Sequence, residues 1–157
     1  MKKLIILLLL PLFNFAQTEF TEVVQVDSTT KKTVLYSNSL NWFAKTFKSA
    51  NNVIQMKDAE TGKVIGKGIL SAAPKSMGVK GDGSTWATIT ITSKDGKYKY
   101  EFTEIYFQYR AGTTFKYDGQ PGMGQKKAFE GWKEEVKNEI NAMIVELKKE
   151  MAKKDNF

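Results

Sequence analysis

Two stretches of alternating apolar and polar residues flank the dipeptide Asp95-Gly96, and this pattern limits the fold more than any other feature of the chain. Before the dipeptide, residues 86–92 carry alanine and isoleucine on one parity and tryptophan and threonine on the other. After it, tyrosine and phenylalanine alternate with polar residues over 98–102. Such alternation is typical of strands with one buried face, and Asp-Gly is a preferred tight turn between antiparallel strands. The segment is therefore predicted to be a β-hairpin.

The alternation after this turn changes phase at Glu104, and Ile105 begins a new apolar series that continues to Tyr109. One extra residue inserted into a strand produces this change of phase. We therefore expect a β-bulge near Thr103 and Glu104.

Three more strands are predicted at residues 20–26, 53–56 and 64–70, where alternating or β-favouring residues lie between turn residues. Gly66 and Gly68 share one face of the third of these strands. Glycine weakens a strand, and two glycines on one side suggest that a helix or a ligand lies close to the backbone there.

Two helices are predicted from apolar residues that recur three or four positions apart. The first lies within residues 31–48, after a turn in which Thr29 or Thr30 can cap it. The second spans residues 129–151, about six turns with a continuous apolar stripe. Because this stripe needs cover, we expect the second helix to lie across the sheet.

The predicted order of elements is β-α-β-β-β-β-α, in one α+β domain over residues 17–157. A single antiparallel sheet with both helices on one face buries the apolar side of every element. Residues 73–84 are rich in glycine, serine and lysine, and residues 111–125 show no periodicity, so both segments are predicted to be loops. The second loop carries aromatic residues that can cover one end of the sheet and terminal helix or form a contact surface.

The N-terminal residues have the three parts of a secretory signal peptide. Two lysines at positions 2 and 3 precede an apolar run, and Ala16 supplies a small residue near its end. The run is shorter than the roughly 20 residues that span a bilayer. We expect residues 1–16 to be removed, the protein to reach the periplasm or the cell exterior, and the mature chain to have no transmembrane segment. The alternative is an uncleaved membrane anchor.

The chain contains neither histidine nor cysteine. Histidine is the usual general base near neutral pH and the commonest metal ligand, and a thiolate is the nucleophile of cysteine enzymes. Ser-His-Asp triads, thiol nucleophiles and structural zinc sites are therefore excluded. The formal net charge of +7 can attract anionic partners, although many soluble secreted proteins carry a similar balance.

Acidic residues form two close pairs, Asp58 with Glu60 and Glu101 with Glu104. Paired carboxylates can act as acid and base in glycoside hydrolysis or bind calcium. The first pair lies in a predicted turn, where Asp favours local hydrogen bonds, and Glu101 lies on the solvent face of a strand. We interpret both pairs as structural, and we predict no catalytic residue, no metal site and no cofactor.

Aromatic and basic residues are interleaved at Tyr98, Lys99 and Tyr100, and again between Tyr106 and Arg110. This arrangement resembles a stacking platform for single-stranded nucleic acid. Tyrosine is also a good strand former, and a signal peptide disfavours such a partner. We therefore do not expect a nucleic acid ligand.

Several packing and turn residues resemble those of a known family. They are a helix with Trp42 and Phe47 over residues 36–47, and the short runs Val53-Ile54, Gly66-Lys67-Gly68 and Lys94-Asp95-Gly96-Lys97-Tyr98. The pattern is similar to that of a family of small exported bacterial proteins of unknown function, described as having a TATA-binding-protein-like (TBP-like) fold. The resemblance covers residues 22–109. It implies this fold for the chain and implies no activity.

The leading hypothesis for function is a non-enzymatic, exported binding or interaction module. Its partner would be a small ligand or another exported protein. The ligand would enter between the sheet and the terminal helix, near Gly66 and Gly68, or contact Arg110, Phe115 and Tyr117 around the second loop. A long helix over a curved sheet can leave an apolar pocket, which motivates this hypothesis.

Two alternatives belong to other classes of protein. A carboxylate-based hydrolase would place Glu101 or Glu104 in an open cleft and raise the pKa of one of them. A structural or inhibitory partner of another exported protein would instead show an exposed apolar patch without a cavity.

Overall fold

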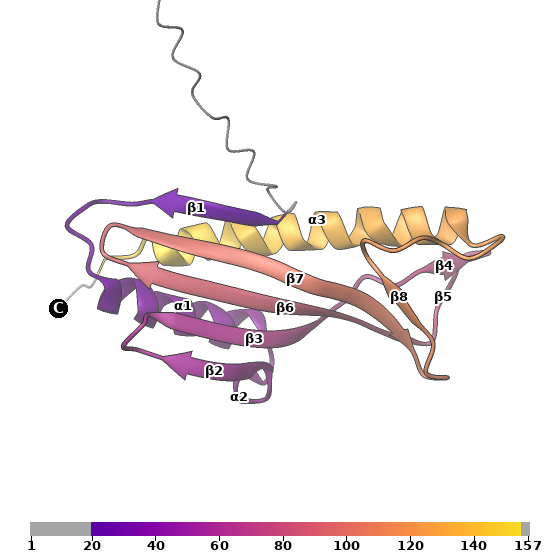
Figure 1. The fold of residues 1–157 in the computed structure, drawn as a ribbon, viewed down its shortest axis with the longest axis horizontal. Helices are drawn as coiled ribbons and strands as arrows, with labels where there is room; N and C mark the ends of the chain where they lie inside the picture. The colour runs from indigo at the N-terminus through magenta and orange to yellow at the C-terminus, as the bar shows by residue number, and fades with distance from the viewer. Residues whose placement is uncertain (1–19, 155–157) are drawn as a thin grey trace, which may run out of the picture.

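An antiparallel sheet forms the centre of the structure, a computed structural model that describes residues 20–154. The strand order is β1-β7-β6-β3-β2, and β8 also pairs with β7 (Figure 1). The predicted signal peptide, residues 1–16, lies outside the described residues. The strands of this sheet are β1 (Thr21–Gln25), β2 (Ile54–Asp58), β3 (Lys63–Leu70), β6 (Gly83–Lys94), β7 (Lys97–Tyr109) and β8 (Thr114–Lys116).

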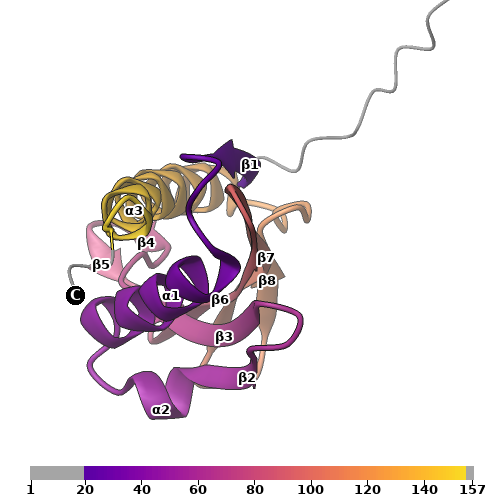
Figure 2. The same ribbon diagram turned by 90° about the vertical axis from the view of Figure 1, so that its left-hand side faces the viewer.

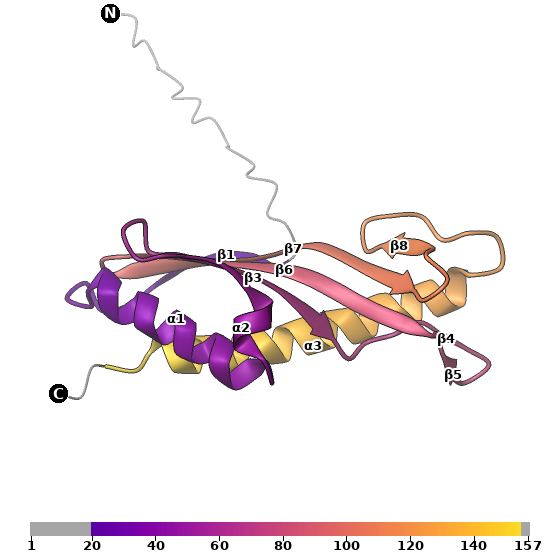
Figure 3. The ribbon, with the colours of Figure 1, turned by 90° about the horizontal axis from the view of Figure 1, so that it is seen from below.

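The two long helices, α1 (Lys32–Thr46) and α3 (Lys126–Met151), lie on the same face of the sheet (Figure 2), as predicted. The α3 helix runs lengthwise along the sheet rather than across it, and it extends beyond the part that α1 covers (Figures 1 and 3). A one-turn helix, α2 (Ala50–Val53), lies between α1 and β2, where the sequence predicted neither a helix nor a strand before residue 53. No helix within residues 20–154 is long and apolar enough to cross a membrane.

Both predicted loops contain short strands. The β4 (Lys75–Ser76) and β5 (Val79–Lys80) strands form a small separate hairpin within residues 73–84. The β8 strand interrupts residues 111–125 and joins the main sheet at the outer edge of β7. Strands of two or three residues are too short to show a periodicity, which is why the sequence pattern missed them.

The apolar core lies between the sheet and the two long helices. Trp132 of α3 lies in this core, and its polar N–H is hydrogen-bonded there. Its Nε1 donates to Thr85 Oγ1 at 2.9 Å, and the Thr85 hydroxyl donates to the Ala72 carbonyl at 2.5 Å. A buried indole N–H without an acceptor would be costly. The largest fully buried side chains include Trp42, Trp132, Tyr98, Phe43, Phe107, Leu35, Ile89 and Ile91.

Polar contacts attach the helices to each other and to the sheet. The buried carboxylate of Glu150 in α3 accepts hydrogen bonds from Lys45 of α1 at 2.7 Å and from Lys153 at 2.7 Å. Burial opposes ionisation of Glu150, but these two ammonium groups outweigh it and hold the pKa of the carboxyl below its ordinary value. On the other side of α3, Glu22 of β1 accepts from Tyr100 Oη at 2.5 Å and from Lys148 Nζ at 2.7 Å.

The first helix is capped by a residue of the central hairpin turn rather than by Thr29 or Thr30. The backbone N–H of Lys32 donates to Asp95 Oδ1 at 2.7 Å. No side chain adjacent in sequence caps the helix. Asp95 therefore both shapes the β6–β7 turn and satisfies one of the free N–H groups at the start of α1.

Candidate functional site

A β-bulge in β7 creates the main irregularity of the sheet, at the position predicted from the sequence. The register between β6 and β7 shifts between Trp86 and Thr88. Glu104 is the extra residue, with a φ of 49°, a left-handed conformation that is uncommon outside glycine. The Thr88 hydroxyl donates to Glu104 Oε2 at 2.7 Å, which holds this carboxylate on the open face of the sheet, away from the helices.

Two separate segments cover the outer edge of β7, and they end on either side of the bulge. The Phe102 N–H donates to the Phe20 carbonyl at 3.0 Å, next to the β1 pairing. The Tyr117 N–H donates to the Ile105 carbonyl at 2.9 Å, next to the β8 pairing. The rings of Phe20 and Tyr117 meet across the join, with centroids 5.6 Å apart. The backbone pairing along the outer edge of β7 is therefore interrupted at the bulge, between these two segments.

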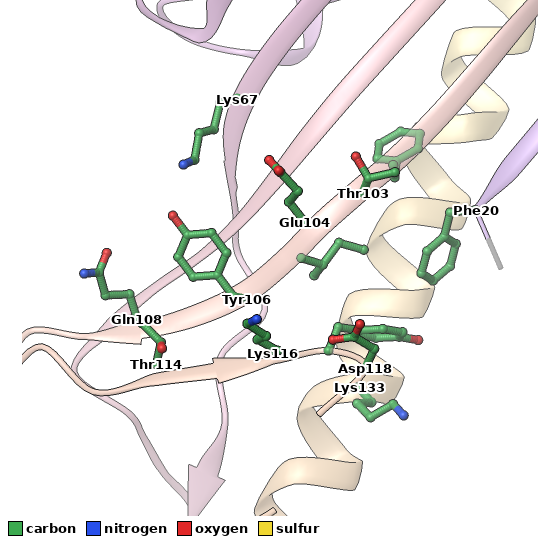
Figure 4. Close-up of a pocket in the computed structure, with 13 residues that line it drawn as sticks. Phe20, Lys67, Thr103, Glu104, Tyr106, Gln108, Thr114, Lys116, Asp118 and Lys133 are labelled. Carbon is green, nitrogen blue, oxygen red and sulfur yellow. The ribbon is translucent and has the colours of Figure 1, made fainter. Parts of the chain in front are cut away.

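A solvent-open groove of about 1010 Å³ lies at this interruption, and we call it the bulge groove. In Figure 4, Lys67, Glu104 and Tyr106 line one side of it, while Phe20, Asp118 and Lys133 line the other. It is assembled from β3, β7, α3, β8 with the two residues after it, and Phe20, which directly precedes β1. The full lining comprises Phe20, Lys67, Phe102, Thr103, Glu104, Ile105, Tyr106, Gln108, Thr114, Lys116, Tyr117, Asp118 and Lys133.

An aromatic pair on the open face of the sheet adjoins the groove. Trp86 of β6 and Tyr106 of β7 are direct cross-strand neighbours. The Lys67 ammonium lies 5.8 Å from the Trp86 ring centroid and 5.3 Å from that of Tyr106. Both distances are within the range of cation–π attraction, so the two rings hold the ammonium at the mouth of the groove.

The groove contains more cationic than anionic side chains. Lys67, Lys116 and Lys133 face two carboxylates, Glu104 and Asp118. Within residues 20–154, neither Lys67 nor Lys116 has a carboxylate at ion-pair distance. Lys133 lies 5.0 Å from the Tyr117 ring centroid. The unpaired ammonium groups can therefore bind an anionic or hydroxyl-rich ligand without breaking an ion pair.

Gly66 and Gly68 do not line this groove, because they face the helices. A Cβ on Gly66 would lie 2.4 Å from Phe43 Cε1, and one on Gly68 would lie 2.4 Å from Phe47 Cε1. The sequence allowed either a helix or a ligand at these glycines, and the structure places there the rings of Phe43 of α1 and of Phe47, which directly follows α1. These rings fill the space that was assigned to a ligand.

The other three predicted site residues have different environments. The Arg110 side chain is exposed and lies 3.4 Å from Asp82. Phe115 packs against the core, with its ring centroid 6.2 Å from that of Phe129. Tyr117 lines the bulge groove. The structure thus brings one of the five residues into the candidate site.

The carboxylates of the two pairs singled out in the sequence have different hydrogen-bond and ion-pair partners. Asp58 accepts from the backbone N–H groups of Glu60 and Thr61 in the turn, and the hydrogen bonds from Thr61 lower the pKa of its carboxyl. Glu101 pairs with Lys99 at 2.7 Å on the strand surface. Glu104 lies in the groove. The structural interpretation therefore fits Asp58 and Glu101, whereas Glu104 belongs to the candidate site.

Most of the groove could not be predicted from the sequence because its lining comes from five separate segments of the chain. Lys67 carried one usable signal, since it alternates with Gly66 and Gly68 and must therefore point to the opposite, open face. Tyr98 and Tyr100 are buried in the core, so they provide no stacking surface. Among the described residues no group of three or more acidic side chains is placed to hold a metal ion.

A second, smaller hollow of about 530 Å³ lies between the β4–β5 hairpin and the beginning of α3. Small residues form much of its wall, namely Ala73, Gly78, Gly124, Ala128 and Gly131. Lys75 of the hairpin and Glu135 of α3 form an ion pair beside it. The hydrogen bond that Lys75 donates, together with the charge of its ammonium group, lowers the pKa of the Glu135 carboxyl.

Comparison with known proteins supports the fold. A family model described as a domain of unknown function (DUF4468) with TBP-like fold matches residues 20–108. The structure of a DUF4468 family protein from Bacteroides ovatus is similar with a TM-score of 0.67 at 17% identity, over 88% of each chain. A TBP-like protein from Parabacteroides distasonis gives a TM-score of 0.68 at 12% identity, over 84% of this chain and 90% of that one. No curated protein matches the chain.

Proposed function

The chain belongs to the DUF4468 family, which has a TBP-like fold and no assigned function, and we propose that it is a non-enzymatic, exported binding module whose ligand occupies the bulge groove. The family match ends at Gln108, so it includes the bulge but not β8 or α3. The lining of the groove therefore comes partly from inside the matched region and partly, through β8, the residues after it and α3, from outside it. The fold itself assigns no ligand, so the proposal depends on the groove alone.

The convergence of unpaired polar groups on an aromatic surface is the observation that carries this proposal. Binding sites are usually concave, largely apolar, and supplied with a few oriented polar groups. The bulge groove combines the rings of Phe20, Tyr106 and Tyr117 with the ammonium groups of Lys67 and Lys116. Because it is open to solvent, it suits a polar ligand of which only part is enclosed.

Binding is favoured over catalysis by the chemistry that the groove offers. The chain has no histidine or cysteine, and the groove carboxylate Glu104 accepts a hydrogen bond from Thr88. A hydrolytic acid needs a raised pKa. In the described part of the chain, the carboxyls whose pKa the surroundings displace, such as those of Glu22 and Glu150, have it lowered.

Export is part of the proposal because of the signal-peptide pattern at residues 1–16. Expression of the full chain in a bacterial host, followed by intact-mass measurement of the released protein, tests it. The mass should correspond to a chain that begins near Gln17. Retention of the full-length chain in the membrane fraction would contradict export.

Native mass spectrometry of the released protein tests the groove. The wild type should retain a ligand mass that Lys67→Met and Tyr106→Ala lose. Lys63→Met is the matched control, because Lys63 precedes Lys67 by four residues on the same face of β3 but lies outside the groove. A ligand retained by all variants would place the site elsewhere.

Tryptophan fluorescence supplies an independent readout with a defined probe, inorganic phosphate. Trp42 and Trp132 are buried, so Trp86 beside Lys67 is the indole that can respond to an anion at the groove. Phosphate should change the emission of the wild type and not that of Lys67→Met. Turnover of a substrate by the pure protein, abolished by Glu104→Gln, would instead support the hydrolase alternative.

A further inference from the structure

One end of the molecule exposes apolar side chains on two separate projections. We call this end the tip and define it as residues 75–80, the β4–β5 hairpin, together with residues 123–127, where the last loop enters α3. Figures 1 and 3 show both projections at the same end of the long axis. Met77 and Met123 have relative exposures of 102% and 104%, and Val79 of 71%. These methionine side chains gain almost nothing from packing within the fold.

The backbone at Met77 makes this residue unfavourable for the hairpin itself. Met77 has a φ of 52° and Gly78 a φ of 81°, so the turn requires left-handed conformations at both central positions. Asn or Asp followed by Gly is the usual choice in such a turn. Methionine adopts this conformation with strain and packs against nothing there. The fold therefore gains nothing from methionine at this position.

The beginning of α3 is likewise unfavourable for the helix. Lys126 and Lys127 occupy its first turn, which contains no acidic residue, and no side chain caps the helix. The N-terminal end of a helix carries a partial positive charge that lysine opposes and an anion favours. Residues that break local rules without internal compensation are expected at functional sites.

The charges of the tip indicate which kind of partner would compensate the unfavourable conformation of Met77 and the unfavourable lysines at the start of α3. Lys75 is paired with Glu135, but Lys80, Lys126 and Lys127 have no carboxylate at ion-pair distance in the described part of the chain. Each of these lysines lies within four residues of an exposed methionine in the chain, and Lys126 and Lys127 also stand at the positive end of α3. An anionic surface with an apolar interior satisfies both features at once.

A bilayer fits this arrangement better than a protein partner does. Protein interfaces bury about 800 Å² on each side and are enriched in aromatic residues and depleted in lysine. The tip has no aromatic side chain and is rich in lysine, and its apolar groups are three side chains on projecting loops. Such projections need a partner that deforms around them, which lipid headgroups and acyl chains can do.

We propose that the tip is a docking surface for an anionic phospholipid bilayer. Met77, Val79 and Met123 insert into the boundary between headgroups and acyl chains. Lys80, Lys126 and Lys127 contact the lipid phosphates. The long axis of the molecule then stands away from the membrane, and the contact is peripheral, because the inserted elements are loop ends and not a spanning helix.

Vesicle sedimentation tests this proposal. The released protein is mixed with vesicles of phosphatidylcholine containing phosphatidylglycerol, and in parallel with phosphatidylcholine alone. Binding to the anionic vesicles should be stronger, and Lys126→Gln with Lys127→Gln should weaken it by about tenfold or more. The matched control is Lys48→Gln with Lys57→Gln, which removes the same charge from exposed positions outside the tip. If both double variants weakened vesicle binding equally, the effect would be due to net charge alone, and the proposal would be overturned.

The apolar contribution is tested with Met77→Ser and Met123→Ser combined. This variant should bind anionic vesicles about tenfold more weakly, whereas Val145→Ser, at an exposed apolar position in the C-terminal half of α3, should bind as the wild type does. Met123→Trp should show a blue shift of its emission on vesicle binding. Unchanged binding by the serine variant would overturn the proposal, as would a dimer in sedimentation velocity that this variant abolishes. All variants are compared as the released protein, so they share the same N-terminus.

Discussion

The proximal half of the molecule, where α1 and α3 both cover the sheet, differs sharply from the distal half, where β6 and β7 extend beyond α1 (Figure 3). The proximal half has glycines fitted to rings, a helix cap from Asp95, and the Glu150 cluster between the helices. The distal half has the bulge groove, the small hollow and the tip. Candidate binding features thus begin where the double helix cover ends.

The distal half nevertheless shares the hydrophobic core of the proximal half. Phe107 and Trp132 are buried there as completely as Trp42 is in the proximal half. The ring centroids of Phe107 and Trp132 lie 6.4 Å apart, so β7 and α3 are in contact beyond the end of α1. We expect the difference between the halves to concern their surfaces and not their cooperativity.

Truncation of the two buried tryptophans gives the largest expected effect. Trp42→Ala and Trp132→Ala should each lower the free energy of unfolding by about 3–5 kcal/mol, because each leaves a large cavity in a packed core. Thermal unfolding followed by circular dichroism measures both. A single transition shifted in both variants is expected. A second transition that appears only in Trp132→Ala would mean that the distal half unfolds on its own.

A methyl group added to a glycine should have opposite signs in the two halves. Gly66→Ala pushes a Cβ against the buried Phe43 ring and should cost about 1–3 kcal/mol. Gly131→Ala, in α3, meets no atom within 4 Å and should gain about 0.5–1 kcal/mol from helix propensity. Urea denaturation gives both values. Partial recovery in Gly66→Ala with Phe43→Leu would assign the cost to this contact, and no recovery would contradict it.

Acid should weaken the proximal half through Glu150. Its pKa in the folded protein is below the ordinary value of 4.5, so the unfolded chain binds the proton more readily, and stability falls as pH decreases from about 4.5 through the folded pKa. Glu150→Gln should lower stability by about 1–2 kcal/mol at neutral pH. It should also flatten the loss of stability below pH 4.5. Identical acid dependence in the variant and the wild type would show that other carboxylates carry the effect.

The sequence predicted what local periodicity can encode. The strands from Val64 to Tyr109, the bulge at Glu104 and the stripe of α3 each follow from residues within one element. The TBP-like fold is confirmed. The groove depends instead on side chains such as Phe20, Lys67 and Lys133, which come from separate elements. No local pattern in the sequence shows that residues so far apart in the chain line one groove. The cap from Asp95 to Lys32 was missed for the same reason.

The smallest expected effect separates stability from function at the tip. Lys126→Glu places a negative charge at the positive end of α3 and should raise the free energy of unfolding by about 0.3–1 kcal/mol. Met77→Asn suits the left-handed turn and should raise it by a few tenths of a kcal/mol. Both variants should bind anionic vesicles more weakly than the wild type does.

Denaturation and vesicle sedimentation of the same two variants test whether these residues serve binding rather than the fold. The free energy of unfolding should rise while the affinity for anionic vesicles falls. In the proximal half, by contrast, a change such as Gly66→Ala should lower stability and leave vesicle binding unchanged in the folded protein. If Lys126→Glu and Met77→Asn were instead destabilising, the lysine and the methionine would serve the fold. The tip would then be an ordinary helix start and hairpin, and the contrast between the two halves would reduce to the bulge groove.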